Sequence, residues 1–465
     1  MGRITFLVLF IFISINTAAQ KSENDSLQIR AIYNEVLENG EAYDNLRYLC
    51  KEIGPRLSGS ENAAKSVTWT QQLMQSYGFD KVWLQEVMVE YWVRGEKETC
   101  VMHSKDTDAY TQLSICALGR SIGTNGQLSA QVIEVSSIED LKGRLDEEIK
   151  GKIVFINQPM NQKYIETFRA YGEAGPIRYN GASEAAAKGA VAMINRSLST
   201  IYDDNPHTGA MKYKDSLNMI PAAAISILGA GLLHGALQKG PVDIAMKMSC
   251  ENLPDAKSYN VIGQITGSKY PDEVIVVGGH LDSWDLAEGA HDDGAGVMQS
   301  VEVLRIFKKL NIQPEHTVRS VLFMNEENGL RGGKAYARSA MNSNEKHIYA
   351  IESDAGGFTP RGFSFDVEPE KMVSIESWES IFEPYLTDRF IKGWGGADIG
   401  PLKSTGTVLI GYRPDSERYF DVHHSATDVF EAVNKRELHL GAAGMASLIY
   451  LLDRYGLPGK HNSGK

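Results

Sequence analysis

Between residues 258 and 456, the chain alternates short apolar runs with longer amphipathic segments. The apolar runs predict β-strands at 273–279, 318–324 and 347–353. Helical spacing predicts α-helices at 293–311, 329–343, 370–387 and 435–455. Strands and helices that alternate in this way form a mostly parallel sheet covered by helices. We therefore predict an α/β fold with a mostly parallel, mixed sheet that is flanked by helices.

Residue types that bind metals follow several of these predicted strands. The segments are GGHLDS at 278–283, GAHDDGAG at 289–296, NEENG at 325–329, ESDAGG at 352–357 and HHS at 423–425. In open α/β sheets the carboxyl ends of the strands line one crevice, so we expect these segments to converge. An acidic residue at a helix start can also serve the helix dipole alone. The repeated placement of His, Asp and Glu beside glycines favours a functional site.

The donor set consists of imidazoles and carboxylates without a thiolate. This set suits zinc and leaves manganese or cobalt open. There are more carboxylates than one ion needs, so one aspartate can bridge two ions about 3.5–4 Å apart. Such a pair lowers the pKa of a bound water to about 7, and a neighbouring carboxylate then serves as general base. The sequence contains no HExxH, GxSxG or GxxxxGK[ST] motif that would indicate another chemistry.

These segments resemble the co-catalytic dizinc exopeptidase family of aminopeptidases and glutamate carboxypeptidases, from about residue 30 to residue 456. The shared stretches also include GPRLSGSE at 54–61 and GGADIGPL at 395–402. Many aminopeptidases of the family carry Ser-Asp-His where this chain has Gly396-Ala397-Asp398-Ile399. That difference favours the glutamate carboxypeptidase branch, and it leaves open which peptide end is recognised.

The resemblance implies two zinc ions per chain, held by His280, Asp292, Glu327, Asp354 and His424. In the family's arrangement, Asp292 bridges the two ions. His280 and Asp354 complete the ligands of one ion, and Glu327 and His424 complete those of the other.

Two further residues receive roles from the same resemblance. Glu326 is the expected general base that activates the water. Asp282 is the expected carboxylate that orients the imidazole of His280. The implied activity is hydrolysis of dipeptides or short peptides by an exopeptidase. The alternatives are an aminopeptidase on the same scaffold and a catalytically silent receptor, which the complete set of ligand positions disfavours.

The middle of the chain, residues 112–250, has a different texture. Short β-like runs at 151–156 and 190–194 flank a helix of small residues at 181–188. This segment is similar to the β-rich protease-associated domain that is inserted in this branch of the family. Residues 20–111 and 251–457 are then the two parts of the peptidase domain, and the resemblance implies a homodimer.

The first residues read as a signal peptide over 1–19. Arg3 precedes an apolar run at 4–15, and Thr17-Ala18-Ala19 offers a cleavage site. The alternative is a membrane anchor, but 12 residues (4 to 15) fall short of the roughly 20 that span a bilayer. We expect a secreted or periplasmic protein without a membrane partner, and a short tail at 458–465.

Charge and cysteine content limit the partners further. The net charge is 47 − 59 = −12, which argues against nucleic acid as a partner. The four cysteines, Cys50, Cys100, Cys116 and Cys250, form no CxxC pair, so a cysteine-based zinc site is not expected. Cys100 and Cys116 are either neighbours across a hairpin or buried free thiols.

Overall fold

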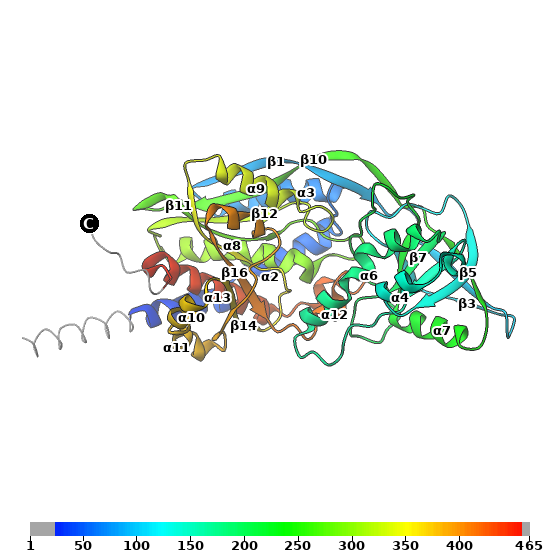
Figure 1. The fold of residues 1–465 in the computed structure, drawn as a ribbon. Helices are drawn as coiled ribbons and strands as arrows, with labels where there is room; N and C mark the ends of the chain where they lie inside the picture. Colours follow the sequence, from blue (N-terminus) through cyan, green and yellow to red (C-terminus); the bar gives the residue numbers. More distant parts are fainter. Residues whose placement is uncertain (1–23, 458–465) are drawn as a thin grey trace, which may run out of the picture.

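The computed structural model describes residues 24–457. The expected signal peptide at 1–19 and tail at 458–465 lie outside the described residues. The chain forms two eight-stranded sheets, each covered by helices (Figure 1). We call the part built on the first sheet the main unit, and residues 99–247, which build the second sheet, the second unit.

The sheet of the main unit is mixed. In spatial order, its strands are β1 (Lys81–Val93), β10 (Glu251–Ile265), β12 (His316–Phe323), β11 (Tyr270–His280), β13 (Lys346–Glu352), β16 (Val408–Pro414), β14 (Pro360–Asp366) and β15 (Arg389–Lys392). The four central strands, β12, β11, β13 and β16, are parallel to one another. β10 and β14 pair antiparallel with the outer strands of this group. The α/β sheet predicted from the sequence is confirmed, and β11, β12 and β13 are the three predicted strands.

Both faces of this sheet are buried because the central strands are apolar at successive positions. Ile275 and Val277 of β11 face a core that includes α3 (Glu61–Ser76), α8 (Ala295–Lys309) and α13 (Lys435–Tyr455). Val274 and Val276 of the same strand face a second core beneath α9 (Arg331–Met341). A helix at residues 24–39 and α2 (Ala42–Tyr48) extend the first layer. This alternation follows from the two-residue period of a strand.

The helix expected at 370–387 is broken into three pieces. These are α10 (Pro369–Glu376), α11 (Glu379–Phe382) and the 3₁₀ turn η3 (Glu383–Tyr385). Pro384 lies in the last piece, where a proline lacks the N–H that a continuing helix needs. The other predicted helices in this half of the chain are observed as α8, α9 and α13.

The second unit mixes parallel and antiparallel pairs. Its strands, in spatial order, are β3 (Ala109–Gln112), β2 (Thr99–Ser104), β9 (Val242–Lys247), β5 (Leu128–Val135), β6 (Ile153–Ile156), β7 (Ala192–Arg196), β8 (Ala222–Ile225) and β4 (Ile115–Ala117). Its longest helix is α6 (Thr167–Ala187), and the shorter ones are α4 (Ile138–Gly143), α5 (Asp146–Ile149) and α7 (Ile227–Leu237). Because β2 and β3 belong to this sheet, the unit begins before the expected boundary at residue 112.

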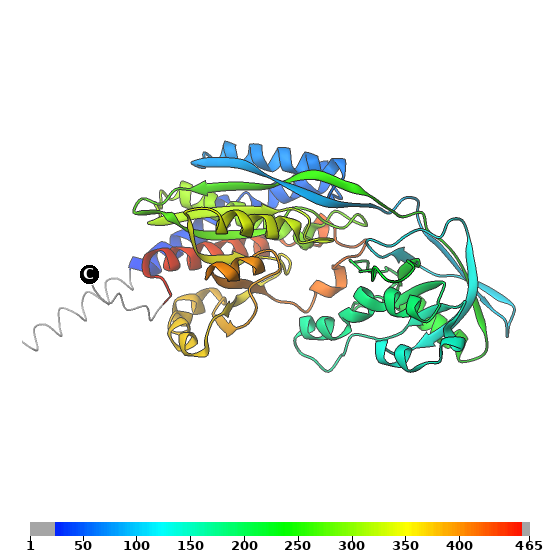
Figure 2. The ribbon, with the colours of Figure 1, turned by 45° about the horizontal axis from the view of Figure 1, so that its top comes forward.

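The long strands β1 and β10 connect the two units, as Figure 2 shows. Side chains also pack between the units near the end of this ribbon. Arg94, whose side chain is only 10% exposed, forms an ion pair with Asp285 at 2.6 Å and donates to the carbonyl of Ala117 in the second unit at 2.8 Å. Gly119 lies directly against the indole of Trp284, so that even a methyl group at position 119 would clash with the ring. The second unit is therefore seated closely on the loop that follows β11.

All four cysteines are buried free thiols. Cys100 lies opposite Met246 of β9, and Cys116 lies opposite Ala224 of β8, so the idea that they face each other across a hairpin is wrong. Burial raises the pKa of both thiols to about 12. None of the helices within residues 24–457 combines the length and apolarity needed to cross a membrane.

A buried histidine makes the stability of the main unit dependent on pH. His347 on β13 is buried, and the Tyr336 hydroxyl contacts its Nε2 at 3.0 Å. Arg319 donates a hydrogen bond to that hydroxyl at 3.2 Å, which places its positive charge near the imidazole. Burial, aided by the charge of Arg319, lowers the pKa of His347 to about 4. The folded chain therefore holds this imidazole neutral.

We predict that His347→Gln weakens the acid sensitivity of folding. The unfolded imidazole has a pKa of about 6.5, so the wild-type contribution is full above pH 6.5 and is lost as the pH falls towards 4. The expected effect is at most about 1.4 kcal/mol per pH unit for one group. Urea unfolding at several pH values between 6.5 and 4 measures it. Parallel pH profiles for wild type and variant would contradict this account of His347.

Candidate metal centre

The carboxyl ends of three adjacent strands bring the predicted residues together. His280 is the last residue of β11, and β11 lies between β12 and β13 in the sheet. Glu326 and Glu327 follow β12, and Asp354 follows β13. Strands that are parallel and adjacent place such residues at one edge of the sheet. The expected convergence is therefore observed.

One group of possible ligands consists of His280, Asp292 and Asp354. Asp292 lies on the short π-helical turn η2 (Ala290–Gly294), between β11 and α8. Nε2 of His280 is 3.2 Å from Oδ1 of Asp292 and 3.6 Å from Oδ1 of Asp354. The ligand atoms of the three residues lie within 4.8 Å of one another, close enough to hold one metal ion.

A second group lies on the other side of Asp292. Nε2 of His424 is 3.2 Å from Oδ2 of Asp292 and 3.2 Å from Oε2 of Glu327. The two oxygens of Asp292 therefore face different imidazoles, Oδ1 towards His280 and Oδ2 towards His424. Oδ2 is buried and accepts no hydrogen bond. A buried carboxylate oxygen without a hydrogen bond is costly, and a cation bound to it would offset that cost.

His423 is a further candidate that the sequence analysis passed over, although the HHS motif contained it. Its Nε2 is 3.6 Å from Oδ2 of Asp292, and its ring stacks on His424 with centroids 3.6 Å apart. Asp292, His423 and His424 also form a group that can hold a metal ion. The Nδ1 atom of His423 has no hydrogen-bond partner.

Main-chain carbonyls distinguish the two predicted histidine ligands from His423. Nδ1 of His280 lies 2.9 Å from the carbonyl oxygen of Asp282, and Nδ1 of His424 lies 3.2 Å from that of Thr208. A carbonyl only accepts, so Nδ1 of His280 donates. Nδ1 of His424 also lies 3.4 Å from Nη1 of Arg178, which only donates, and we assign the proton to this Nδ1 because its contact with the Thr208 carbonyl is the shorter one. In both histidines Nε2 is the atom directed at Asp292. A hydrogen bond to the second ring nitrogen is typical of histidines that bind metals.

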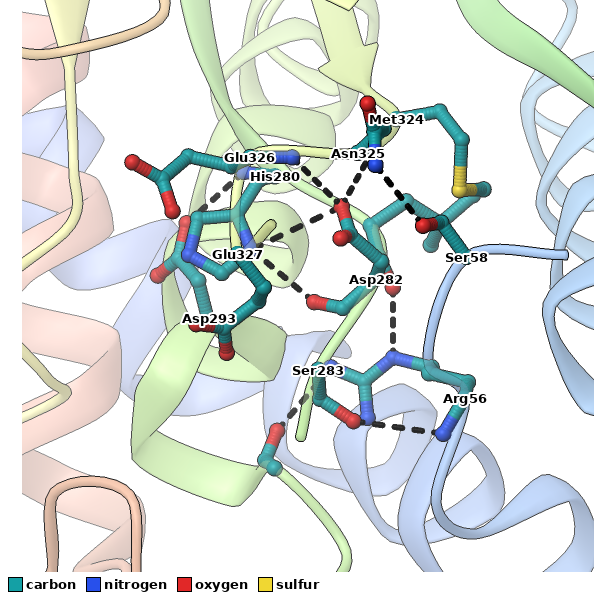
Figure 3. Close-up of polar contacts among 12 residues, drawn as sticks. Arg56, Ser58, His280, Asp282, Ser283, Asp293, Met324, Asn325, Glu326 and Glu327 are labelled. Carbon is teal, nitrogen blue, oxygen red and sulfur yellow. Dashed lines mark hydrogen bonds and ion pairs between the residues drawn. The ribbon is translucent and has the colours of Figure 1, made fainter. Parts of the chain in front are cut away.

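The carboxylate of Asp282 acts differently from what the resemblance implied. Its Oδ1 is 3.9 Å from Nδ1 of His280, while it accepts hydrogen bonds from the main-chain N–H groups of Asn325 at 2.6 Å and Glu326 at 3.1 Å. Asp282 thus contacts the imidazole through its main chain and holds the turn before Glu327 through its side chain. Figure 3 shows this network, with the side chain of Glu326 pointing away from it.

Arg56 fixes the loop that follows β11. It comes from the GPRLSGSE segment and is fully buried. Its guanidinium donates to three main-chain carbonyls, those of Leu281 at 2.6 Å, Glu288 at 2.6 Å and Gly289 at 3.0 Å. The family resemblance included this segment but assigned no role to its residues. The structure shows that it clamps both ends of the loop between His280 and Asp292.

Two further carboxylates hold the main chain around the centre. Asp293 accepts from the N–H of His280 at 3.0 Å and from that of Gly296 at 3.0 Å. Asp428 accepts from the N–H groups of His291 at 2.7 Å and Asp292 at 3.0 Å. No local pattern around Asp428 could have identified it, because its partners lie more than 130 residues away.

The centre buries several carboxylates close together, and their mutual repulsion and burial shift the pKa values of these groups. Burial would raise the pKa of Asp292, but the close imidazoles of His280 and His424 hold that pKa well below its usual range. Burial and the charge of Asp292 raise the pKa of Glu327 to about 7. Burial also raises the pKa of Glu326 well above its usual range, and the charges of Asp354 and Glu327 add to that effect. Bound cations would remove this penalty.

A cavity of about 750 Å³ opens onto the centre between the two units. The main unit contributes Glu326, Asp354 and Arg413 to its wall, and α6 of the second unit contributes Tyr171 and Arg178. The cavity is large enough for a small peptide, because small-molecule sites usually occupy about 300–1,000 Å³.

Known proteins with similar sequences decide the family. Residues 260–449 match peptidase family M28. Carboxypeptidase Q from Bos taurus is 33% identical over 413 residues, which cover 88% of this chain and 85% of the relative. Carboxypeptidase Q from Homo sapiens is 34% identical over 424 residues, covering 91% and 87%. The chain belongs to peptidase family M28.

Solved structures agree with this assignment. The crystal structure of a peptidase M28 precursor from Shewanella amazonensis SB2B has a TM-score of 0.88 at 33% identity, covering 93% of this chain and 97% of that one. A zinc aminopeptidase from Bacillus subtilis shares the fold, with a TM-score of 0.61 at 19% identity over 88% of this chain and 94% of that one. The predicted α/β fold, the predicted family and the predicted class of enzyme, a metallo-exopeptidase, are confirmed.

Proposed function

We propose that this M28 peptidase is an exported dizinc exopeptidase that hydrolyses dipeptides or short peptides. The observation that carries the proposal is the position of Asp292, whose two oxygens each face a different histidine. Imidazoles and carboxylates without a thiolate suit zinc at such a centre. The zinc aminopeptidase that shares the fold supports the choice of metal.

His280 and Asp354 would complete the site of one ion, and Glu327 and His424 would complete that of the other. His424 is preferred to His423 because only His424 has its Nδ1 held by a carbonyl. Both predicted histidines then direct Nε2 towards Asp292. When bound, paired zinc ions supply Lewis acidity and lower the pKa of a water molecule to about 7.

Glu326 would act as the general base and then as the general acid. Its carboxylate lines the cavity and makes no hydrogen bond or ion pair among residues 24–457, whereas that of Glu327 contacts His424. Glu326 would take a proton from the attacking water and return it to the leaving nitrogen of the peptide. Burial raises the pKa of Glu326, which suits a group that must receive a proton near neutral pH.

Two arginines in the cavity wall support recognition of a free peptide carboxylate. Arg178 donates to the Tyr171 hydroxyl at 2.6 Å, and Arg413 donates to Ser364 at 2.8 Å. Within residues 24–457, neither guanidinium forms an ion pair with a carboxylate. This favours a carboxypeptidase or dipeptidase over an aminopeptidase, since an amine would be repelled by unpaired cations.

Three further parts of the proposal rest on the sequence and the family resemblance. Residues 1–19 would direct export to the periplasm or the medium. The second unit would be the protease-associated domain of this branch, and it would restrict the cavity to short peptides. The active form would be a homodimer.

We predict that selectivity depends on the free carboxylate and that activity depends on metal. Free dipeptides and N-acylated dipeptides should be cleaved, whereas amidation of the carboxyl end should lower kcat/KM at least tenfold. Loss of cleavage on acylation of the amino end, with no effect of amidation, would indicate an aminopeptidase instead.

The metal dependence is tested separately. A chelator should abolish cleavage and zinc should restore it. Cleavage inside a long peptide that is blocked at both ends, or full activity without metal, would contradict an exopeptidase of this kind.

We predict that Glu326→Gln lowers kcat by about 10²–10⁴-fold, the usual contribution of general acid–base catalysis. The amide keeps the shape of the side chain but cannot accept the proton, so zinc content and KM should stay near wild type. Glu139→Gln on the exposed surface of α4 is the matched control and should change neither quantity.

Measuring turnover and bound zinc on the same Glu326→Gln preparation separates the possibilities. Near-normal turnover would show that Glu326 only stabilises the turn after β12. Loss of zinc together with activity would show that Glu326 is a ligand and would reverse the roles of Glu326 and Glu327.

A further inference from the structure

The turn that carries His424 is held by the second unit. The main-chain N–H of Thr208 donates to the carbonyl oxygen of His424 at 2.9 Å. The carbonyl oxygen of Thr208 in turn lies 3.2 Å from Nδ1 of His424. One residue of the second unit therefore contacts both the main chain and the imidazole of a predicted ligand, across 216 residues of sequence.

His207 holds the preceding residue of the same turn. Its Nδ1 lies 2.6 Å from the carbonyl oxygen of His423, so Nδ1 carries the proton and donates it. The side chain of His207 is buried, and its Nε2 has no hydrogen-bond partner. Among residues 24–457, the bond to His423 is thus the only hydrogen bond that the imidazole of His207 makes.

The second unit anchors this pair of residues firmly. The N–H of His207 donates to the hydroxyl of Ser197 at 2.9 Å, and that hydroxyl donates to the carbonyl of Ile225 in β8 at 2.7 Å. The hydroxyl of Thr208 donates to the carbonyl of Ala117 in β4 at 2.8 Å. His207 and Thr208 are therefore fixed to the sheet of the second unit before they reach the turn.

The turn itself needs such support. His424 has a φ of +62°, in the left-handed region that residues other than glycine rarely adopt. A residue in this conformation persists where its surroundings determine it. Local hydrogen bonds join His423 to Tyr419 and Ser425 to Val422, but the carbonyls of both histidines accept from the second unit.

We propose that His207 and Thr208 are positioning residues of the metal centre, and that the second unit is in this way part of the zinc site. The Thr208 carbonyl sets the ring of His424 so that Nε2 faces Asp292 and Glu327, and His207 holds the turn on which that ring stands. The inference rests on the proposed zinc site. It gives the second unit a role in metal binding, in addition to its proposed role of restricting the cavity to short peptides.

The two zinc positions should depend differently on this contact. His280 and Asp354 receive no hydrogen bond from the second unit among those of the described residues. The loss of the His207 contact should therefore weaken the ion assigned to Glu327 and His424 and spare the other. A general loss of folding would affect both.

Three substitutions of His207 test this. His207→Asn places an amide nitrogen at the position of Nδ1, so it keeps the donor. His207→Gln moves that nitrogen one carbon further from the main chain, and His207→Phe keeps a ring but has no donor. We expect the Gln and Phe variants to bind one of two zinc equivalents about 10–100-fold more weakly, the usual effect of losing such a support, and His207→Asn to stay within about threefold of wild type.

Zinc affinity is measured by equilibrium competition with a chelator, and the melting temperature of each metal-free variant is measured beside it. His234→Gln is the control, because it makes the same change at a half-exposed histidine of α7 that pairs with Glu134, and its zinc affinities should match wild type. Wild-type zinc binding by the Gln and Phe variants would overturn the inference. An equal loss at both equivalents that follows the melting temperature, in Asn, Gln and Phe alike, would also overturn it. A wild-type protein that binds no zinc would instead refute the proposed function.

Discussion

Negative charge buried at one edge of the main sheet is the constraint on which the rest of the structure depends. Asp292 and Glu327 are buried beside the partly buried Asp354, with only a few imidazoles near them, and the burial of these two carboxylates would be costly without cations. Asp292 lies at the centre, because each of its oxygens faces a different histidine. The hydrogen bonds of the surrounding loops serve to keep these side chains in place.

The support of this edge comes mostly from groups that fix main chain. Arg56 binds three carbonyls of the loop after β11, Asp282 binds two N–H groups of the turn after β12, and Asp428 binds two N–H groups of η2. Each of these side chains is buried, so water cannot replace the bonds. The second unit supplies the same kind of support to the turn with His424. In this account both units build the metal site, because the main unit carries the proposed ligands and the second unit holds the turn with His424.

Sequence patterns predicted three of the four central strands, and the convergence of His, Asp and Glu residues at their carboxyl ends, for a common reason. Each predicted ligand among His280, Glu327 and Asp354 directly follows an apolar run, and glycines beside them mark sharp turns. The helix at 370–387 was mispredicted because its spacing looked helical. Pro384 accounts for its end after α11, while the earlier break falls at Ser377 and Trp378, whose N–H groups bond to the carbonyls three residues before them. The central strand β16 and the strands β14 and β15 beyond it were missed.

Contacts between distant segments could not be predicted from local patterns. The roles of Asp428 and His207, and the main-chain contact of Asp282 with His280, depend on which loops meet after folding. The same limitation explains Cys100 and Cys116, whose neighbours on other strands are Met246 and Ala224. His423 was present in the HHS motif, but only the hydrogen bonds of the two rings distinguish it from His424.

The most direct test of the central claim is the anomalous diffraction of a zinc-loaded crystal at the zinc absorption edge. The account predicts two peaks per chain, about 3.5–4 Å apart, with one oxygen of Asp292 on each. His280 and Asp354 should complete one site, and Glu327 and His424 the other. A single peak, or a second peak bound by His423 with His424 turned away, would contradict it.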